Sequence, residues 1–297
     1  MDKNNTENIQ DFQDEQPMGS SSVSPGPDSP APQNHTKKRK KRHPFLLIIF
    51  LIALGGFGFS AFKIGSYLYS TYLSNKVRSE IAGKVKNVDD EQLSDRELMW
   101  RKYGDIYNDN NDFMGWLIVE GTPIDNPVMY TPDDGMDGQF YLRKNFYGEY
   151  DIVGTLFIDD RCKLDPEKGV STNTIIYGHR TINDTMFGPL QRFKDPAFCA
   201  ENTNILFDTM YRPGQYKLFA AILSEATDGD PDAFKYYDFI QAEDEKALED
   251  YLYEIEKRAV YYDNENAPKF GDEILTLSTC DKYKTDGRLA LIAKRIN

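Results

Sequence analysis

A cysteine and an arginine near the end of the chain have types and spacing suited to nucleophilic catalysis. Cys280 ends the apolar segment LTLSTC, and Arg288 opens the next apolar segment after DKYKTDG. A free thiol, with a pKa of about 8.5, is only a few per cent thiolate at neutral pH, so a catalytic cysteine needs a base or a cation. Asp286-Gly287 is typical of a hairpin turn, which would return Arg288 to Cys280. A guanidinium there could stabilise a thiolate or a developing oxyanion.

His179 is the one histidine available as a base for that cysteine. The other two histidines, His35 and His43, precede a long apolar segment that would separate them from Cys280. His179 follows the apolar stretch TIIYG, and strand ends that open into loops commonly present catalytic groups. A single histidine is more often structural, and a lone strand-end cysteine is usually a small buried hydrophobe. The spacing alone leaves both interpretations open.

The composition of the 297-residue chain limits its class. Hydrophobic residues make up 40% and aromatic residues 13%, which allows a substantial core in one sizeable domain with appendages. The net charge of −13 argues against a nucleic-acid partner, because phosphate binding needs clustered Lys and Arg. The chain has no glycine-rich phosphate loop, and one available histidine with dispersed cysteines builds no zinc set. We therefore expect no cofactor and no metal.

An uncharged stretch, FLLIIFLIALGGFGFSAF, occupies residues 45–62 and follows six consecutive basic residues at 37–42. At about 1.5 Å per residue it nearly spans a hydrocarbon core of about 30 Å, and KIGSYLYSTYL can extend it into the interface. The stretch is apolar on all faces, is longer than a usual signal-peptide core, and has no clear cleavage site after it. These features favour an uncleaved anchor over a core helix or a cleaved signal peptide. The basic run would stay in the cytoplasm, with the C-terminal bulk outside.

Composition divides the chain into four parts. Residues 1–43, rich in Asn, Gln, Ser, Pro and Asp, predict a disordered cytoplasmic tail that ends in the basic run. Residues 44–69 predict a transmembrane signal anchor. Residues 70–104 predict a helical linker, because their scattered apolar positions indicate one or two amphipathic helices. Residues 105–297 are expected to form the catalytic domain.

Short β-like runs separated by Gly, Pro, Asn and Asp fill the C-terminal part of the chain. The eight candidates lie at 115–121, 126–130, 154–159, 173–179, 204–208, 215–223, 273–280 and 288–296. They predict a mainly β fold, an eight-stranded closed or nearly closed barrel with an N-terminal helical segment. A long amphipathic helix is predicted at 242–259, before the last two strands, with acidic residues first and basic residues last. A shorter helical stretch, MFGPLQRF, follows His179.

The chain has three cysteines, an odd number for an exported protein. No disulfide framework can use Cys162, Cys199 and Cys280 together. Cys162 and Cys199 could pair, although two ordinary thiols are favoured.

These motifs resemble the sortases, cysteine transpeptidases of Gram-positive bacteria, and in detail class B of that family. The segment TLSTC precedes an arginine at a strand start, and YGHR lies about a hundred residues upstream. The segments NDFMGWLIVEGTPIDNPVMY, FYLRKNFYGEYDIVGTLFID and IIYGHRTINDTMFGPLQRFKDPAFCAENTNILF are similar to further parts of the family. The long helix before the final strand pair separates class B from the more compact classes. The resemblance covers roughly residues 105–297.

The resemblance implies an eight-stranded sortase barrel with His179, Cys280 and Arg288 as catalytic residues. Cys280 would attack the Thr carbonyl of a C-terminal sorting signal of the N-P-x-T type. His179 would protonate the leaving amine and deprotonate the incoming one, and Arg288 would hold the substrate and its oxyanion. The residues implied to line the substrate groove are Ser278, Thr279, Asp281 and Leu142.

The resemblance also implies partners and a location. The substrates would be secreted proteins that carry a sorting signal, and the acceptor would be an amine of a peptidoglycan precursor or a pilin lysine. The protein would cross the cell membrane once, with its N-terminus in the cytoplasm and its catalytic domain outside. Three alternatives stay open: a pilin-polymerising sortase, a Cys–His hydrolase that transfers its acyl group to water, and a non-catalytic wall-binding protein of the same fold.

Overall fold

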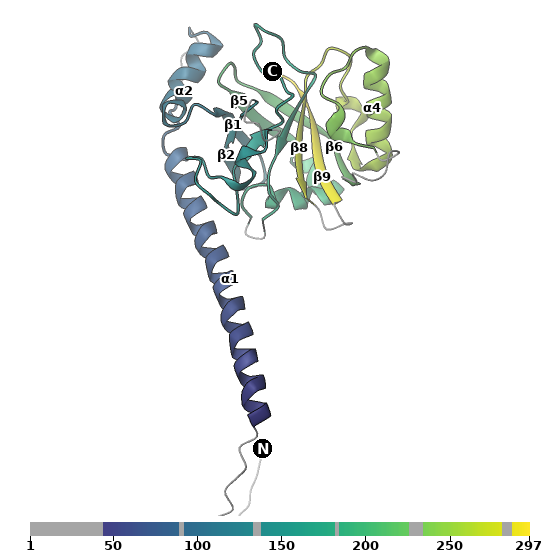
Figure 1. Cartoon of the computed structure of the whole chain (residues 1–297). Coiled ribbons are helices and arrows are strands. Elements are labelled where there is room, and N and C mark those ends of the chain that lie inside the picture. The colour runs from purple at the N-terminus through teal and green to yellow at the C-terminus, as the bar shows by residue number, and fades with distance from the viewer. Residues whose placement is uncertain (1–43, 89–91, 133–137, 182–183, 226–233, 281–286) are drawn as a thin grey trace, which may run out of the picture. The chain divides into compact units, whose positions relative to one another are not determined.

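The computed structural model describes residues 44–88, 92–132, 138–181, 184–225, 234–280 and 287–297 (Figure 1). The strands are β1 (Phe113–Val119), β2 (Ile124–Met129), β3 (Leu156–Ile158), β4 (Asn173–Tyr177), β5 (Asn204–Thr209), β6 (Gln215–Glu225), β7 (Ala259–Tyr262), β8 (Ile274–Cys280) and β9 (Gly287–Arg295). The α-helices are α1 (Pro44–Ala82), α2 (Asp95–Asp109), α3 (Pro196–Glu201) and α4 (Glu245–Arg258). The 3-10 helices are η1 (Phe140–Arg143), η2 (Gly188–Lys194), η3 (Tyr236–Asp238) and η4 (Asn264–Asn266).

The described strands form a closed barrel of eight in the order β5-β1-β2-β3-β4-β8-β9-β6, and β6 closes it by pairing with β5. The predicted eight-stranded barrel is therefore confirmed. β7 is an addition outside the ring. Along one edge of the 11-residue β6, residues 215–217 pair with β5 and residues 220–222 pair with β7, whereas β9 pairs with the opposite edge. This division of one long edge explains how a ninth strand joins without opening the barrel.

Strand β8 lies between a parallel and an antiparallel neighbour. It pairs with β4 in parallel, up to the pair Tyr177↔Ser278. It pairs with β9 antiparallel, up to the pair Cys280↔Arg288. The carboxyl ends of parallel strands meet at one edge, and a hairpin returns the start of the next strand to that edge. The end of β4, the end of β8 and the start of β9 therefore meet at one end of the barrel.

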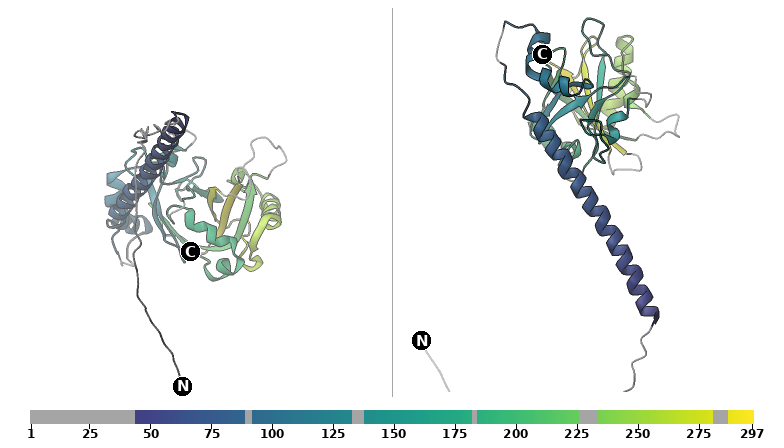
Figure 2. Two further views of the ribbon diagram at one scale, coloured as in Figure 1. Left: turned by 90° about the horizontal axis from the view of Figure 1, so that it is seen from below. Right: turned by 60° about the vertical axis from the view of Figure 1, so that its left-hand side comes forward.

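Both faces of β8 are covered, and every residue of the strand before Cys280 is buried. Leu275 and Leu277 join the cluster that fills the barrel interior, whereas Ile274 joins a second cluster outside it. That outer cluster is covered by α4, which contributes Leu248 and Ile255 (Figure 1, Figure 2). The side-chain period of two along the strand separates these two sets. Helix α4 thus fixes the outer face of the sheet that carries Cys280.

Several predicted boundaries differ from the observed ones for identifiable reasons. The helix expected at 242–259 begins at Glu245, because the carboxylate of Asp244 accepts from the Ala247 amide at 2.8 Å and caps it. It ends at Arg258 because Ala259 already belongs to β7. The strand expected from residue 154 starts later, since Gly154 adopts a φ of +67°. The stretch after His179 forms the 3-10 helix η2.

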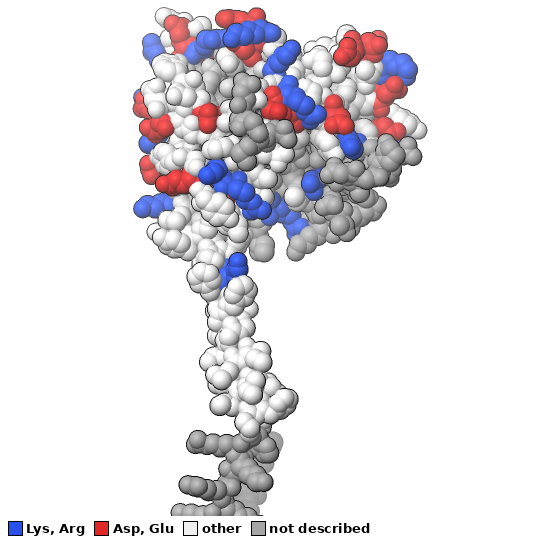
Figure 3. Space-filling model, in the orientation of Figure 1, with Lys and Arg blue, Asp and Glu red and all other residues white. Residues whose placement is uncertain are grey.

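Helix α1 is one continuous helix of 39 residues, and among the described residues it is the single helix long and apolar enough to cross a membrane, by length and composition only. Figure 3 shows its surface as almost uncharged. The chain has two compact units, residues 1–53 and 54–297, and the barrel belongs to the second. Within that unit, Ile81 of α1 is fully buried in a third cluster with Met99 and Tyr103 of α2 and Phe113 of β1. The last turns of α1 are thus part of the folded unit.

Candidate active site

Cys280 and Arg288 face each other as register partners at the end of the β8–β9 hairpin. The loop between them, 281–286, lies outside the described residues and includes the expected groove residue Asp281. The Cys280 side chain is exposed, and Arg288 is half-buried, with its Nη1 donating to the Gly287 carbonyl at 3.2 Å. The predicted hairpin return of Arg288 to Cys280 is confirmed.

The three cysteines differ in accessibility. Cys162 and Cys199 are free and buried, so the expectation of two ordinary thiols is confirmed. Burial raises the pKa of each of these two thiols to about 12, which keeps them protonated and unreactive. Cys280 is exposed at the surface of the folded unit. Of the three thiols, the exposed one is the group that a substrate can reach.

Two hydrogen bonds hold the segment before His179 against the segment before Cys280. The Gly178 amide donates to the Ser278 carbonyl at 3.2 Å, continuing the β4–β8 ladder. The Thr279 hydroxyl donates back to the Gly178 carbonyl at 2.8 Å. His179 directly follows Gly178 and Cys280 directly follows Thr279, so the two residues lie on neighbouring segments just beyond these hydrogen bonds.

Packing requires a glycine at position 178. The glycine is visible in the sequence motif YGH, but the reason for it is seen only in the structure. A Cβ on Gly178 would lie 2.5 Å from Leu156 Cδ2 and 2.6 Å from the ring of Phe187. The Phe187 amide in turn donates to the His179 carbonyl at 3.1 Å. The close approach of Phe187 thus fixes the backbone that presents His179.

The His179 ring is oriented by a backbone oxygen. Its Nε2 lies 2.8 Å from the carbonyl oxygen of Leu142, at the end of η1. A carbonyl can only accept, so Nε2 carries a proton, and Nδ1 is the free nitrogen of the neutral ring. Burial lowers the pKa of His179; Arg143 lowers it further, while the Leu142 hydrogen bond and Asp151 oppose the decrease. The neutral imidazole therefore predominates at neutral pH.

The expected groove residues Ser278 and Thr279 are almost completely buried, each with 2% of its surface exposed. The Ser278 hydroxyl shares a 2.6 Å hydrogen bond with the hydroxyl of Tyr236, a fully buried residue of η3. The Thr279 hydroxyl is engaged by Gly178. Both hydroxyls are therefore already engaged, and the backbone of this part of β8 is paired with β4 and β9. Leu142, the other expected groove residue, is half-buried and touches the His179 ring through its carbonyl.

Tyr236 and Gly154 are parts of the site that sequence reasoning missed. The buried Tyr236 hydroxyl has its pKa raised to about 12 by desolvation, and it lies within electrostatic reach of Arg288 and Cys280. A Cβ on Gly154 would lie 2.5 Å from the Leu142 oxygen that meets His179. Neither contact has a local signal, since Tyr236 reaches Ser278 across 42 residues of sequence. Within the described part of the chain, no group of three or more His, Cys, Asp or Glu side chains is arranged to hold a metal ion.

We expect the His179 imidazolium to titrate below about 6.5, the ordinary histidine value. The reason is that burial disfavours the charged ring more than Leu142 and Asp151 favour it. NMR of the full chain in detergent micelles, with ¹³C-labelled histidine and with His35 and His43 replaced by Gln, would report this single ring. A midpoint at or above 6.5 would contradict the burial argument.

The comparisons with known proteins all identify the same family. The sortase domain model matches residues 154–296. Sortase B of Listeria monocytogenes is 29% identical over 251 residues, which cover 83% of this chain and 94% of that protein. Sortase B of Staphylococcus aureus is 31% identical over 189 residues, which cover 63% of this chain and 71% of that protein.

Solved structures agree in fold. A Staphylococcus aureus sortase B–substrate complex matches 80% of this chain and 98% of its own at 26% identity, with a TM-score of 0.58. Sortase B of Bacillus anthracis in complex with AAEK2 matches 76% of this chain and 97% of its own at 26% identity, with a TM-score of 0.63. The closed eight-stranded barrel of this chain agrees with the fold of these structures and with the fold expected from the sequence. On this evidence the chain belongs to the sortase B family of cysteine transpeptidases.

Proposed function

We propose that this sortase is membrane-anchored, cleaves a C-terminal sorting signal of the N-P-x-T type after Thr, and joins the protein to an amine of the cell-wall precursor. The observation that carries the proposal is the convergence of three segments at one end of the barrel. The exposed Cys280 lies opposite Arg288, and the two residues before Cys280 are hydrogen-bonded to the residue before His179. This arrangement supplies a nucleophile, a cation and a proton carrier.

In the first half-reaction the Cys280 sulfur attacks the Thr carbonyl carbon and the Thr peptide bond breaks. His179 receives the thiol proton and delivers it to the leaving amine, so the products are a thioester and a free amino terminus. Because Nε2 of His179 is engaged by the Leu142 carbonyl, this proton passes through Nδ1. The N–H donors of Arg288 hold the oxyanion of the tetrahedral intermediate.

In the second half-reaction an amine attacks the thioester. His179 takes the proton from the attacking nitrogen, a new amide bond forms, and the Cys280 thiol is regenerated with that proton. The half-buried setting of His179 supports this use, since a neutral imidazole is ready to accept a proton at neutral pH. A solved relative is a sortase B–substrate complex, which supports a sorting-signal substrate here too.

The anchoring part of the proposal rests on α1. Its large apolar side chains are exposed along the helix, from Phe45 at 70% to Phe62 at 71%. A continuous apolar surface of this kind is unfavourable in water and favourable in a bilayer. With the basic run at 37–42 in the cytoplasm, the chain would cross the cell membrane once and hold its catalytic domain outside.

The first test is amine transfer. The full chain in detergent micelles, given an N-P-x-T peptide and an amine nucleophile, should cleave after Thr and release a product that carries the amine. Cys280→Ala should lower turnover by at least about a thousandfold, because the nucleophile is lost. Cys162→Ala, which removes a buried thiol, is the matched control and should retain turnover. A product that never contains the amine would mean a hydrolase, and an active Cys280→Ala chain would refute the catalytic assignment.

The second test concerns the cation. Arg288→Lys should lower kcat/KM by about a hundredfold, because an ammonium lacks the planar fork of donors that fits an oxyanion. Arg295→Lys, at the other end of β9, is the matched control for loss of an arginine from the same strand. Steady-state kinetics with the same peptide would measure both variants. Near-full turnover of Arg288→Lys would exclude an oxyanion or substrate clamp.

A further inference from the structure

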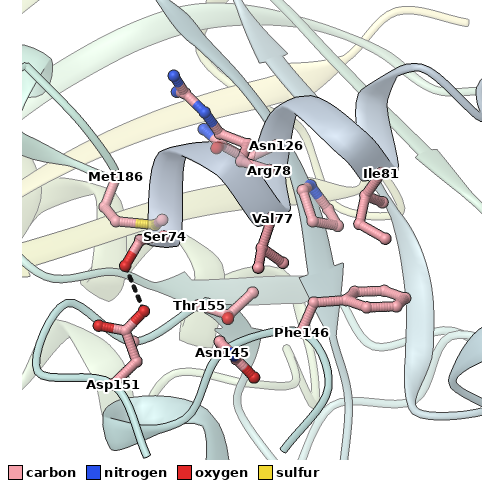
Figure 4. Close-up of a pocket in the computed structure, with 12 residues that line it drawn as sticks. Ser74, Val77, Arg78, Ile81, Asn126, Asn145, Phe146, Asp151, Thr155 and Met186 are labelled. Atoms are coloured by element: carbon pink, nitrogen blue, oxygen red, sulfur yellow. Dashed lines mark hydrogen bonds between the residues drawn. The ribbon is translucent and has the colours of Figure 1, made fainter. Parts of the chain in front are cut away.

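Asp151 is a buried carboxylate that the reaction above does not use. It has 5% of its surface exposed and lies in the loop after η1. Its oxygens accept from the Val153 amide at 2.9 Å and from the Ser70 hydroxyl at 3.0 Å. The Ser74 hydroxyl also donates to it, as Figure 4 shows. Two serines one turn apart on α1 therefore hold one carboxylate of the barrel unit.

The loop that carries Asp151 folds back on the end of η1. The Asp151 amide donates to the Arg143 carbonyl at 3.0 Å, and Arg143 Nη1 donates to the Ile152 carbonyl at 2.8 Å. Three residues after Asp151, Gly154 is pressed against the Leu142 carbonyl, where a Cβ would lie 2.5 Å from the oxygen. Asp151 is thus tied to the residue after Leu142, and the segment that follows Asp151 packs against the Leu142 carbonyl.

The Leu142 oxygen is the atom that meets Nε2 of His179 at 2.8 Å. The connection therefore runs from Ser70 and Ser74 to Asp151, from the Asp151 amide to Arg143, and from the adjoining Leu142 carbonyl to the His179 ring. Two charged side chains act on the imidazole electrostatically: Arg143 lowers its pKa and Asp151 raises it. Arg143 ends η1 and Asp151 lies in the loop that folds back on it, so the placement of this segment affects the ring through geometry and through charge.

The contact of α1 with this part of the barrel is incompletely packed. A cavity of about 20 Å³, roughly the room for one water, lies between Ser74 of α1 and Asn126 of β2 (Figure 4). The Asn126 side chain is 1% exposed, and neither its oxygen nor its nitrogen has a hydrogen-bond partner among the described residues. Beside this cavity, the hydroxyls of Ser70 and Ser74 attach this turn of α1 to the barrel unit through Asp151.

We propose that Asp151 is a positioning residue for His179, and that Ser70 and Ser74 of α1 hold it in place. The proposal rests on the catalytic role proposed above for His179. It implies that the helix continuing from the apolar segment helps to set the geometry of the active site. Without the attachment, the Leu142 carbonyl loses its support, and the His179 ring samples orientations that cannot transfer the proton.

The test uses the full chain in detergent micelles. Asp151→Ala removes the carboxylate, whereas Ser70→Ala with Ser74→Ala leaves it in place and removes its attachment to α1. The matched controls are Glu149→Ala, an exposed carboxylate of the same loop, and Ser79→Ala, an exposed serine of the same helix. Should Asp151→Ala fail to fold, the serine pair decides the question.

We expect Asp151→Ala and the serine pair to lower kcat about tenfold with KM changed by less than about twofold, because proton transfer is affected and substrate contacts are not. The pKa of His179, followed by histidine NMR, should fall further in Asp151→Ala, which loses a neighbouring negative charge and weakens the Leu142 hydrogen bond. Both controls should match wild type in both measurements.

The NMR measurement and the kinetic measurement distinguish failure of this inference from failure of the proposed function. The His179 signal and its pKa do not depend on catalysis, so wild-type values in Asp151→Ala would refute the positioning role even in an active enzyme. Wild-type kcat in the serine pair would refute the part assigned to α1. A His179→Gln chain with full turnover would refute the proposed function itself, whatever the NMR result.

Discussion

The parallel pairing of β4 with β8 is the constraint on which the candidate active site depends. In an antiparallel pair, the carboxyl ends of the two strands would lie at opposite ends of the barrel, and His179 could not meet Cys280. The parallel register ends at Tyr177↔Ser278, and His179 and Cys280 each lie two residues beyond that pair on neighbouring segments. The antiparallel β8–β9 hairpin then returns Arg288 to the same end. Strand β8 therefore connects all three groups: it carries Cys280, and it pairs with β4, which precedes His179, and with β9, which carries Arg288.

The strand ends bring these groups together but do not orient the histidine. Segments outside strands β4, β8 and β9 orient it. Phe187 packs over Gly178, where a side chain would not fit, and fixes the backbone of His179. Leu142 sets the ring through its carbonyl, and Gly154 is the residue that fits behind that oxygen. The exposed Cys280 lies on a rigid sheet, whereas His179 is held by loops that other parts of the chain must support.

Much of this arrangement could be predicted from the sequence, because its signals are local. Eight strands and the pairing of the last two follow from short apolar runs and turn residues, and the family motif identifies His179, Cys280 and Arg288 as candidates. Strand β7 was missed because Ala259 follows α4 without any turn residue. The parallel β4–β8 pair, the Tyr236–Ser278 contact and the Asp151 attachment join segments far apart in the sequence. Such contacts leave no local pattern in the sequence, so they could be identified only from the folded structure.

If Cys280 on the β8–β9 hairpin is the nucleophile, as proposed, it must carry the acyl group during the reaction. Mass spectrometry of the full chain, after brief incubation with an N-P-x-T peptide and acid quenching, tests it most directly. We predict a thioester-linked acyl group on the peptide fragment that contains Cys280, and its loss when an amine is added before the quench. An acyl group on another residue would contradict the assignment of Cys280 as the nucleophile, and a Cys280 adduct that persists in the presence of the amine would contradict transfer to an amine.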